Sequence, residues 1–357
     1  MGRNAMTLMP SLAFGQAGKG TKAASGTWPP AIAGEKHVYK KVGDRELCLW
    51  RISPETSPSA SESRGPVKLP CIIFFFGGGW TSGSPEQFLP QARYLASRGM
   101  AAFVADYRVA SRDKVKAAAC VEDAKSAVRY LRVNAEQLQI DPERICAAGG
   151  SAGGHIACAT ALLPGFEVAS EKTEVSSVPN ALALFNPAVM LAPVSGLPIP
   201  QEAESKLESL RERLGAEPDA MSPVHHVRAG LPPTIIFHGR ADTTVNVKTV
   251  EKFTELMQND GNRCELRLYD GAPHGFFNAP NNTQIKTKAA DGAQQADVSP
   301  DEKTKKAQGK KGISSDAAQL QQQRLVWHAQ TLQELDKFLA SLGWISGPPT
   351  LTIPDAK

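Results

Sequence analysis

Residues 149–154 of this chain have the sequence Gly-Gly-Ser-Ala-Gly-Gly. They follow the apolar run 144–148 and precede a helical run of small residues at 155–163. This order predicts a strand, a sharp turn and a helix, with Ser151 at the tip of the turn in a strained backbone conformation. Glycines flank the serine because a Cβ there would collide with the neighbouring strand and helix. The pattern is typical of a nucleophile elbow, and the alternative is a glycine-rich turn with an incidental serine.

Strand-like and helical patterns alternate on both sides of this turn. Strand-like segments lie at 38–52, 70–76, 100–105, 181–185, 234–237 and 264–269. The first alternates and predicts two opening strands, and 70–76 is a continuous apolar run typical of a strand buried on both faces of a parallel sheet. The helical patterns lie between or after them, at 87–97, 117–138, 247–258 and 321–342. The alternation predicts an α/β fold, a doubly wound and mostly parallel sheet with helices on both faces. Ligands in such folds bind at the carboxyl ends of the strands.

Two segments interrupt a domain that we expect to span residues 37–345. Residues 187–224 hold several prolines and a charged helix at 201–214, which predicts a small lid over the site. Residues 281–318 are rich in Lys and polar residues and contain no aromatic residue, which predicts a mobile surface insertion, with a polyanion-binding arm as the alternative. Residues 346–357 form a predicted C-terminal tail.

The first 36 residues are predicted to be a leader outside the folded domain. Arg3 precedes the apolar stretch 5–14, and Gly-Gln-Ala at 15–17 is a small-residue cleavage pattern. This predicts a short secretory signal at 1–17 and a secreted or periplasmic location, although Pro10 and the short apolar length argue against it. The alternative is a disordered leader on a cytoplasmic protein.

Composition excludes several classes of protein. The chain has 357 residues, 41% hydrophobic and 21% charged, with a net charge of +4, which predicts neither a nucleic-acid surface nor a stable membrane insertion. None of the six cysteines has C-x-x-C spacing, so we expect buried free thiols and no zinc or redox site.

A serine hydroxyl is a weak nucleophile, so Ser151 needs a base within hydrogen-bond reach and an acid that orients the base. His274 stands in a Gly/Pro-rich loop directly after the strand-like segment 264–269, where it can swing over the sheet. Among the other histidines, His155 is expected to pack locally and His238 to support the acid loop. His274 is therefore the predicted base.

The acid is expected between Ser151 and His274 in the sequence, after a strand. Asp242 follows the segment 234–237 and fits this requirement. Asp270 is the rival, four residues before His274, where a turn-forming aspartate is the ordinary explanation. We favour Asp242.

Donors for a developing oxyanion are predicted at the end of the strand-like segment 70–76, where Gly77, Gly78 and Gly79 let the backbone approach a reacting centre. Ala152, directly after the serine, supplies a further N–H. A phosphate-binding loop is the rival interpretation, but the glycines are followed neither by G-K-[ST] nor by a Rossmann-type acidic residue.

The chain resembles the α/β-hydrolase family, especially its hormone-sensitive-lipase-like and acetyl-xylan or feruloyl esterase branches. The likeness covers about residues 38–345 without the insertion. It rests on five elements in matching order: residues 76–80 for His-Gly-Gly-Gly-Trp, residues 106–108 for Asp-Tyr-Arg, the elbow, the acid loop at 239–242 and the histidine loop at 274–276. The family pattern implies that the oxyanion donors are Gly78 and Gly79. Phe76 departs from it, because the family usually has a histidine there.

The resemblance implies a serine hydrolase that cleaves carboxylic esters through an acyl-enzyme, without a metal or organic cofactor. The predicted lid segment is short and not strongly apolar, which predicts short acyl groups. The substrate would be a small-molecule or polysaccharide ester, with acetyl or feruloyl esters of plant polysaccharide as candidates. Trp80 and Phe276 would either stack on a substrate ring or pack against the loops. The alternatives are a serine peptidase of the same fold and a non-catalytic binding protein.

Overall fold

The computed structural model describes residues 28–52, 68–195, 197, 201–280 and 315–354, and only the backbone of residues 201–207 and 315–317. The predicted signal at 1–17 and most of the predicted insertion at 281–318 lie outside the described residues. The strands and helices below therefore belong to the described part of the chain.

Eight strands form one sheet in the order β1-β2-β4-β3-β5-β6-β7-β8. The pairs β1–β2 and β2–β4 are antiparallel, and the remaining neighbours are parallel. The predicted doubly wound, mostly parallel sheet is confirmed. The strands are β1 Glu35–Val42, β2 Arg45–Ile52, β3 Leu69–Phe75, β4 Ala101–Ala105, β5 Ile140–Gly150, β6 Ala181–Phe185, β7 Thr234–Gly239 and β8 Cys264–Tyr269.

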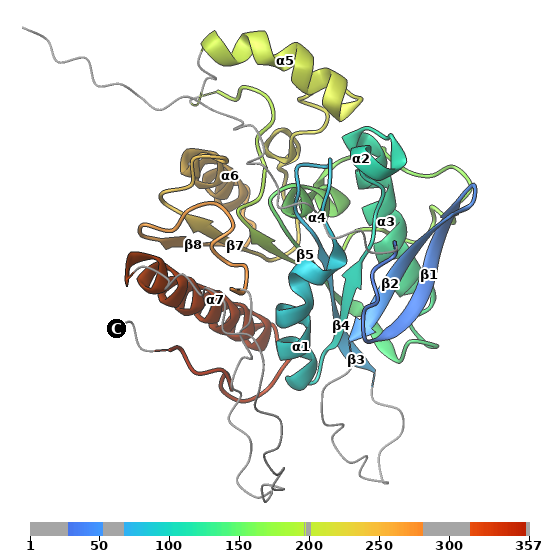
Figure 1. Cartoon of the computed structure of the whole chain (residues 1–357). Coiled ribbons are helices and arrows are strands. Elements are labelled where there is room, and N and C mark those ends of the chain that lie inside the picture. The colour runs from blue at the N-terminus through green and yellow to red at the C-terminus, as the bar shows by residue number, and fades with distance from the viewer. Residues whose placement is uncertain (1–27, 53–67, 196, 198–200, 281–314, 355–357) are drawn as a thin grey trace, which may run out of the picture.

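Helices cover both faces of the sheet (Figure 1). Alternate residues of each strand point to opposite faces, so Ile73 and Phe75 join one apolar cluster while Ile72 and Phe74 join the other. The first cluster includes α3 Ala117–Val133, α4 Ala152–Leu162 and α6 Val247–Asn259, and the second includes α1 Leu89–Ser97 and α7 Ser315–Ser341. Four shorter or outer elements complete the described structure: η1 Pro85–Phe88, α2 Ala110–Asp113, α5 Gln201–Leu214 and η2 Pro223–His226.

Two helix boundaries differ from the sequence prediction by more than three residues. Helix α3 ends at Val133 instead of 138, because Asn134 donates both its backbone and its side-chain N–H to the carbonyl of Tyr130 and closes the last turn. The chain then enters β5 through Gln139 in a left-handed conformation, with a φ of 52°. Helix α7 begins at Ser315, inside the segment assigned to the insertion, and not at residue 321.

The segments before and after the predicted domain contact it. The ring of Trp28, in the predicted leader, lies 3.6 Å from the guanidinium carbon of Arg112. In the predicted tail, Leu351 is 4% exposed and its carbonyl accepts a 2.7 Å hydrogen bond from Gln333 of α7. Trp28 and Leu351 therefore pack against the predicted domain from either end of the described chain.

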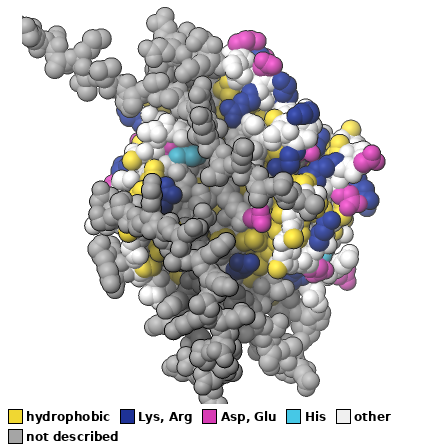
Figure 2. Space-filling model, in the orientation of Figure 1, with side chains coloured by type: hydrophobic (Ala, Val, Ile, Leu, Met, Phe, Trp, Pro, Cys, Tyr) yellow, Lys and Arg dark blue, Asp and Glu magenta, His cyan; other side chains and the backbone are white. Residues whose placement is uncertain are grey.

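The described surface mixes charges of both signs. Figure 2 shows Lys and Arg side chains interspersed with Asp and Glu on the side that carries α2 and the β1–β2 hairpin. All six cysteines lie in the described part of the chain, buried and free, as expected. No helix among the described residues is both long enough and apolar enough to cross a membrane.

Candidate active site

Ser151 stands at the turn between β5 and α4 with φ 54° and ψ −117°. A non-glycine residue rarely adopts a positive φ, so the strained turn expected from the sequence is present. The backbone N–H of Ser151 donates to the carbonyl of Phe185 at the end of β6, over 2.8 Å. A Cβ on Gly153 would collide with the carbonyl oxygens of Phe75 and Phe76 at the end of β3. The glycine thus lets the first turn of α4 approach the sheet.

The structure brings the predicted serine, base and acid together in one hydrogen-bonded line. Oγ of Ser151 lies 3.0 Å from Nε2 of His274, and Nδ1 of His274 lies 2.7 Å from Oδ2 of Asp242. The three residues come from the ends of β5, β8 and β7, whose carboxyl ends meet at the same edge of the sheet. Because Nδ1–H of His274 donates its hydrogen bond to Asp242, Nε2 is left as the acceptor for the serine hydroxyl.

The carboxylate of Asp242 is fully buried and receives four hydrogen bonds. Oδ1 accepts from the backbone N–H groups of Thr244 and Val245, at 2.8 and 2.9 Å. Oδ2 accepts from His274 and from Nδ2 of Asn186, at 2.7 and 2.9 Å. Burial by itself raises the pKa of Asp242, but the hydrogen bond and charge of His274 and the amide of Val245 outweigh it, so the pKa lies below its usual value. The carboxylate is therefore ionised at neutral pH.

The rival acid occupies a different environment. The side chain of Asp270 is 92% exposed and pairs with Nε of Arg240 over 2.9 Å. It has no contact with His274 among the described hydrogen bonds, and its place beside β8 is that of a surface turn residue. The geometry favours Asp242 over Asp270.

His155 and His238 both support the loops of the site. Nε2 of His238 donates to the carbonyl of Val245, three residues after Asp242, over 2.9 Å. His155 is fully buried and forms hydrogen bonds through both ring nitrogens, to Trp80 and to the carbonyl of Met221. Burial lowers the pKa of His155 to about 4, so this imidazole is neutral. Its packing is thus not merely local, as the sequence suggested, because it joins separate loops.

The predicted oxyanion loop follows β3 and lies against the elbow. A Cβ placed on Gly77 would be 3.5 Å from Cβ of Ser151. The carbonyl of Gly78 accepts from the N–H groups of Thr81 and Ser82, both over 3.1 Å. The N–H of Gly79 belongs to the same trans peptide and so points the opposite way, out of this turn. Gly78 and Gly79 have φ values of 125° and 61°, which a side chain would strain.

Ala152 is the first residue of α4. Its N–H has no acceptor within the helix, because the acceptor would have to lie one turn earlier. The described backbone hydrogen bonds outside the helices give it no acceptor either, and its role as an oxyanion donor beside Gly78 and Gly79 stays a prediction.

Phe76 fills the place of the family histidine with an aromatic contact. Its ring is fully buried and stacks on Tyr107, with centroids 4.1 Å apart and planes inclined by 18°. The hydroxyl of Tyr107 donates to the carbonyl of Phe76 over 2.6 Å. The start of the oxyanion loop is thus braced by Tyr107 through both packing and hydrogen bonding.

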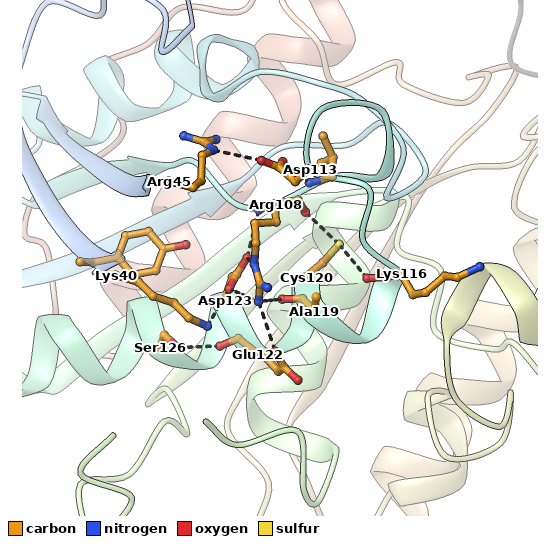
Figure 3. A network of polar contacts seen from close by, with 12 residues as sticks. Lys40, Arg45, Arg108, Asp113, Lys116, Ala119, Cys120, Glu122, Asp123 and Ser126 are labelled. Atoms are coloured by element: carbon orange, nitrogen blue, oxygen red, sulfur yellow. Dashed lines mark hydrogen bonds and ion pairs between the residues drawn. The ribbon is translucent and has the colours of Figure 1, made fainter. Parts of the chain in front are cut away.

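Ion pairs hold Asp106 and Arg108, on either side of Tyr107, to the β1–β2 hairpin and α3. Figure 3 shows that the guanidinium of Arg108 points toward Asp123 of α3 and donates two hydrogen bonds of 2.8 Å to its carboxylate. Lys40 of β1 also donates to Asp123, over 2.7 Å. Asp106 is buried and pairs with Arg45 over 2.5 Å. Burial raises the pKa of Asp106 to about 6, although Arg45 opposes the shift. The network fixes the position of Tyr107.

The two predicted substrate-binding aromatic residues are packed. Phe276 is 1% exposed and lies between Tyr269 and Trp327, so its ring presents no face to a ligand and the stacking alternative is corrected in favour of packing. Trp80 is 4% exposed, and its ring meets His155 edge-on. The guanidinium of Arg213, on α5, lies 5.2 Å from the Trp80 ring.

Comparison with known proteins assigns this arrangement to a family. The family model described as BD-FAE matches residues 60–257, which is more than half of the chain. The chain belongs to the BD-FAE family.

Solved structures agree with this BD-FAE assignment. The native structure of esterase 2 from Thermogutta terrifontis is 42% identical, covers 90% of this chain and 96% of its own, and has a TM-score of 0.71. Structures of that esterase with propionate bound or phosphonylated by sarin cover 90% of this chain and 99% of their own, are again 42% identical, and have TM-scores of 0.70 and 0.71. The expected α/β-hydrolase fold and the likeness to carboxylesterases are confirmed.

A curated relative of the BD-FAE chain is the probable carboxylic ester hydrolase LipM of Mycobacterium tuberculosis. It is 27% identical over 204 residues, which are 53% of this chain and 45% of LipM. The chain spans about half the length of the curated relatives that it matches first.

Three residues around the site of this BD-FAE chain were not found from the sequence. Asn186, after β6, bonds to Asp242; Gln87, in η1, accepts from the N–H of Gly77 over 2.6 Å; and Arg213 donates to the carbonyl of Gly79 over 2.5 Å. For Asn186 a signal existed, because a polar residue directly follows a buried strand of a parallel sheet. Gln87 and Arg213 lie in ordinary helical patterns and carried no such signal.

Proposed function

We propose that this chain is a serine esterase that hydrolyses carboxylic esters through a covalent acyl-enzyme. The observation that supports this most strongly is the line from Ser151 through His274 to Asp242, with hydrogen-bond distances of 3.0 and 2.7 Å. The arrangement matches what a hydroxyl nucleophile needs, namely a neutral imidazole within reach and a buried carboxylate that orients it.

In the proposed reaction, Oγ of Ser151 attacks the ester carbonyl carbon as its proton passes to Nε2 of His274. The negative charge that develops on the carbonyl oxygen is held by the amides of Gly78, Gly79 and Ala152. When the tetrahedral intermediate collapses, the bond to the alcohol breaks and His274 gives the proton to the leaving oxygen. Water then repeats these steps on the acyl-enzyme and releases the acid. Asp242 stays ionised and stabilises the imidazolium.

We propose short acyl groups as the preferred acyl part. Propionate occupies one of the solved structures of the Thermogutta esterase, which is 42% identical to this chain. The segment 187–224 is also short and not strongly apolar, which favours small acyl chains over long lipids. Acetyl or feruloyl esters of plant polysaccharide are the more specific candidates, and they rest on the resemblance to carbohydrate esterases.

The function is tested with p-nitrophenyl esters of two to sixteen acyl carbons, compared for the wild type and Ser151→Ala. We expect wild-type turnover to peak at acetate or butyrate and Ser151→Ala to lose at least about 10³-fold, because the residual rate comes from binding and oxyanion donors alone. A fluorophosphonate probe should label the wild type and not the variant. Equal labelling, or equal turnover, of the wild type and Ser151→Ala would contradict the serine mechanism.

Substrate screening separates the remaining alternatives. Acetylated xylan and methyl ferulate test the polysaccharide hypothesis beside a matched aminoacyl p-nitroanilide, which tests the peptidase alternative. Faster cleavage of the anilide than of the ester would favour a peptidase. Faster cleavage of palmitate than of butyrate would overturn the preference for short acyl groups.

A further inference from the structure

Three side-chain amides link the oxyanion loop to the histidine loop and to the acid. The N–H of Gly77 donates to Oε1 of Gln87 over 2.6 Å, and Nε2 of Gln87 donates to Oδ1 of Asn278 over 2.9 Å. Nδ2 of Asn278 then donates to the carbonyl of Gly275, the residue after His274, over 2.9 Å.

The same loop continues the connection to Asp242. The N–H of Gly275 donates to Oδ1 of Asn186 over 3.2 Å, and Nδ2 of Asn186 donates to Oδ2 of Asp242 over 2.9 Å. The hydrogen bonds therefore run from Gly77 through the histidine loop to Asp242 and connect segments that lie 191 residues apart in sequence, at Gln87 and Asn278.

Backbone groups determine which way each amide points. The N–H of Gly77 can only donate, so Gln87 must present its oxygen to it and its NH₂ group to Asn278. Asn278 must then accept from Gln87 and donate to the carbonyl of Gly275, which can only accept. Both amides must therefore accept on one side and donate on the other. A carboxylate, which only accepts, or an apolar side chain cannot replace either of them without losing a bond.

We propose that Gln87 is a positioning residue that sets the oxyanion donors at the correct distance from the base. The inference rests on the proposed serine mechanism, in which the amides of Gly78 and Gly79 must meet the oxygen of the same intermediate whose serine proton His274 accepts. Small displacements between such groups slow a reaction strongly. Gln87 provides a direct side-chain link between the two loops.

The chain offers a matched control one helical turn away. Gln91 on α1 is fully buried and donates from Nε2 to the carbonyl of Phe277, over 3.2 Å, so it contacts the same loop as Gln87 without contacting the oxyanion loop. His328 also donates to that carbonyl, over 2.7 Å, which keeps it bonded when Gln91 is replaced. The variants Gln87→Met and Gln91→Met thus remove the same chemical group from the same helical segment.

We expect Gln87→Met to lower kcat for p-nitrophenyl butyrate about 10-fold with KM changed by no more than about twofold, because the lost contact acts on the transition state and not on ester binding. Gln91→Met should keep kcat within about twofold of the wild type. Thermal midpoints of both variants report any general loss of stability. Equal kcat losses in the two variants, or an unchanged kcat in Gln87→Met, would overturn the proposal.

A double-mutant cycle tests the connection itself. If Gln87 acts through Asn278, then Gln87→Met combined with Asn278→Ala should lower kcat about as much as the stronger single variant, whereas independent roles would multiply the two losses. Multiplied losses would contradict the proposal. Fluorophosphonate labelling of Ser151 in each variant keeps the two hypotheses apart. A wild type that does not label would reject the serine mechanism, whereas labelling with an unchanged kcat in Gln87→Met would reject only the role of Gln87.

Discussion

The indole N–H of Trp80 donates to Nδ1 of His155 over 3.2 Å, so a buried imidazole on α4 holds the residue that follows the three glycines of the oxyanion loop. The other ring nitrogen donates to the carbonyl of Met221 over 2.7 Å, in the segment predicted to form the lid. His155 therefore contacts the oxyanion loop and the lid segment at once, and it can do so only as a neutral ring that accepts at Nδ1 and donates at Nε2.

The burial of the His155 imidazole predicts that the protein loses stability in mild acid. Burial lowers the pKa of His155 from 6.5 to about 4 in the folded protein. Between these values the unfolded chain binds the proton and the folded protein does not, so the free energy of unfolding should fall as the pH falls from 6.5 to 4, by an amount on the order of 3 kcal/mol. Urea denaturation at several pH values measures it. The difference in stability between the wild type and His155→Gln should narrow from pH 7.5 to pH 4.5, and a constant difference would contradict the assignment.

Replacing the acid should separate the two aspartates that compete for that role in the sequence. Asp242→Asn removes the acceptor that fixes the tautomer of His274, so kcat should fall by about 10³- to 10⁴-fold. Asp270→Asn removes only an exposed ion pair with Arg240, so kcat should stay within about twofold and stability should change by less than about 1 kcal/mol. Steady-state kinetics on p-nitrophenyl butyrate and thermal melts of both variants measure these effects. The reverse order would assign the acid to Asp270.

Replacing Phe76 with histidine, the usual residue of the family, should raise neither the stability of the protein nor its kcat. In Phe76→His the imidazole would enter a fully buried site and would lose the stacking contact that Phe76 makes with Tyr107. An unsatisfied buried polar group costs about 1–3 kcal/mol, so we expect a destabilised variant with no gain in kcat. A variant with unchanged stability and higher kcat would show that the histidine finds partners and braces the loop better than Phe76 does.

The guanidinium of Arg213 is expected to influence kcat through its contacts with the oxyanion loop. It donates to the carbonyl of Gly79 over 2.5 Å and lies over the ring of Trp80, and within the described residues it pairs with no carboxylate. We expect Arg213→Met to lower kcat by about 5- to 10-fold and Arg213→Lys to retain an intermediate rate, because lysine keeps one donor and the charge but not the planar group. If both variants match the wild type in kcat and KM, α5 does not influence the oxyanion loop through this residue.

Much of the fold could be predicted because each signal was local. Buried strands such as β6 and β7 were recognised as short apolar runs, and the charged helix α5 was expected over the same residues, 201–214. Ser151, Asp242 and His274 were found because each follows a strand of a parallel sheet, whose ends meet at one edge.

The remaining features depend on individual hydrogen bonds, some of them between distant segments. The end of α3 is determined by the hydrogen bonds of a single residue, Asn134, and by the turn that leads into β5. Gln87 becomes part of the site only because Asn278, near the other end of the chain, is folded against it. Side-chain amides of this kind occur on many surfaces, so no pattern in the sequence distinguishes these from solvent-exposed ones.

The positive φ of Ser151 lowers the stability of the folded protein at the residue that is the proposed nucleophile. A serine at φ 54° and ψ −117° holds backbone strain on the order of 1–3 kcal/mol, which a glycine at the same place would relieve. Ser151→Gly should therefore be an inactive protein that unfolds at a higher temperature than the active one. In the proposed mechanism, the folded protein therefore gives up stability in order to place the Ser151 hydroxyl beside His274.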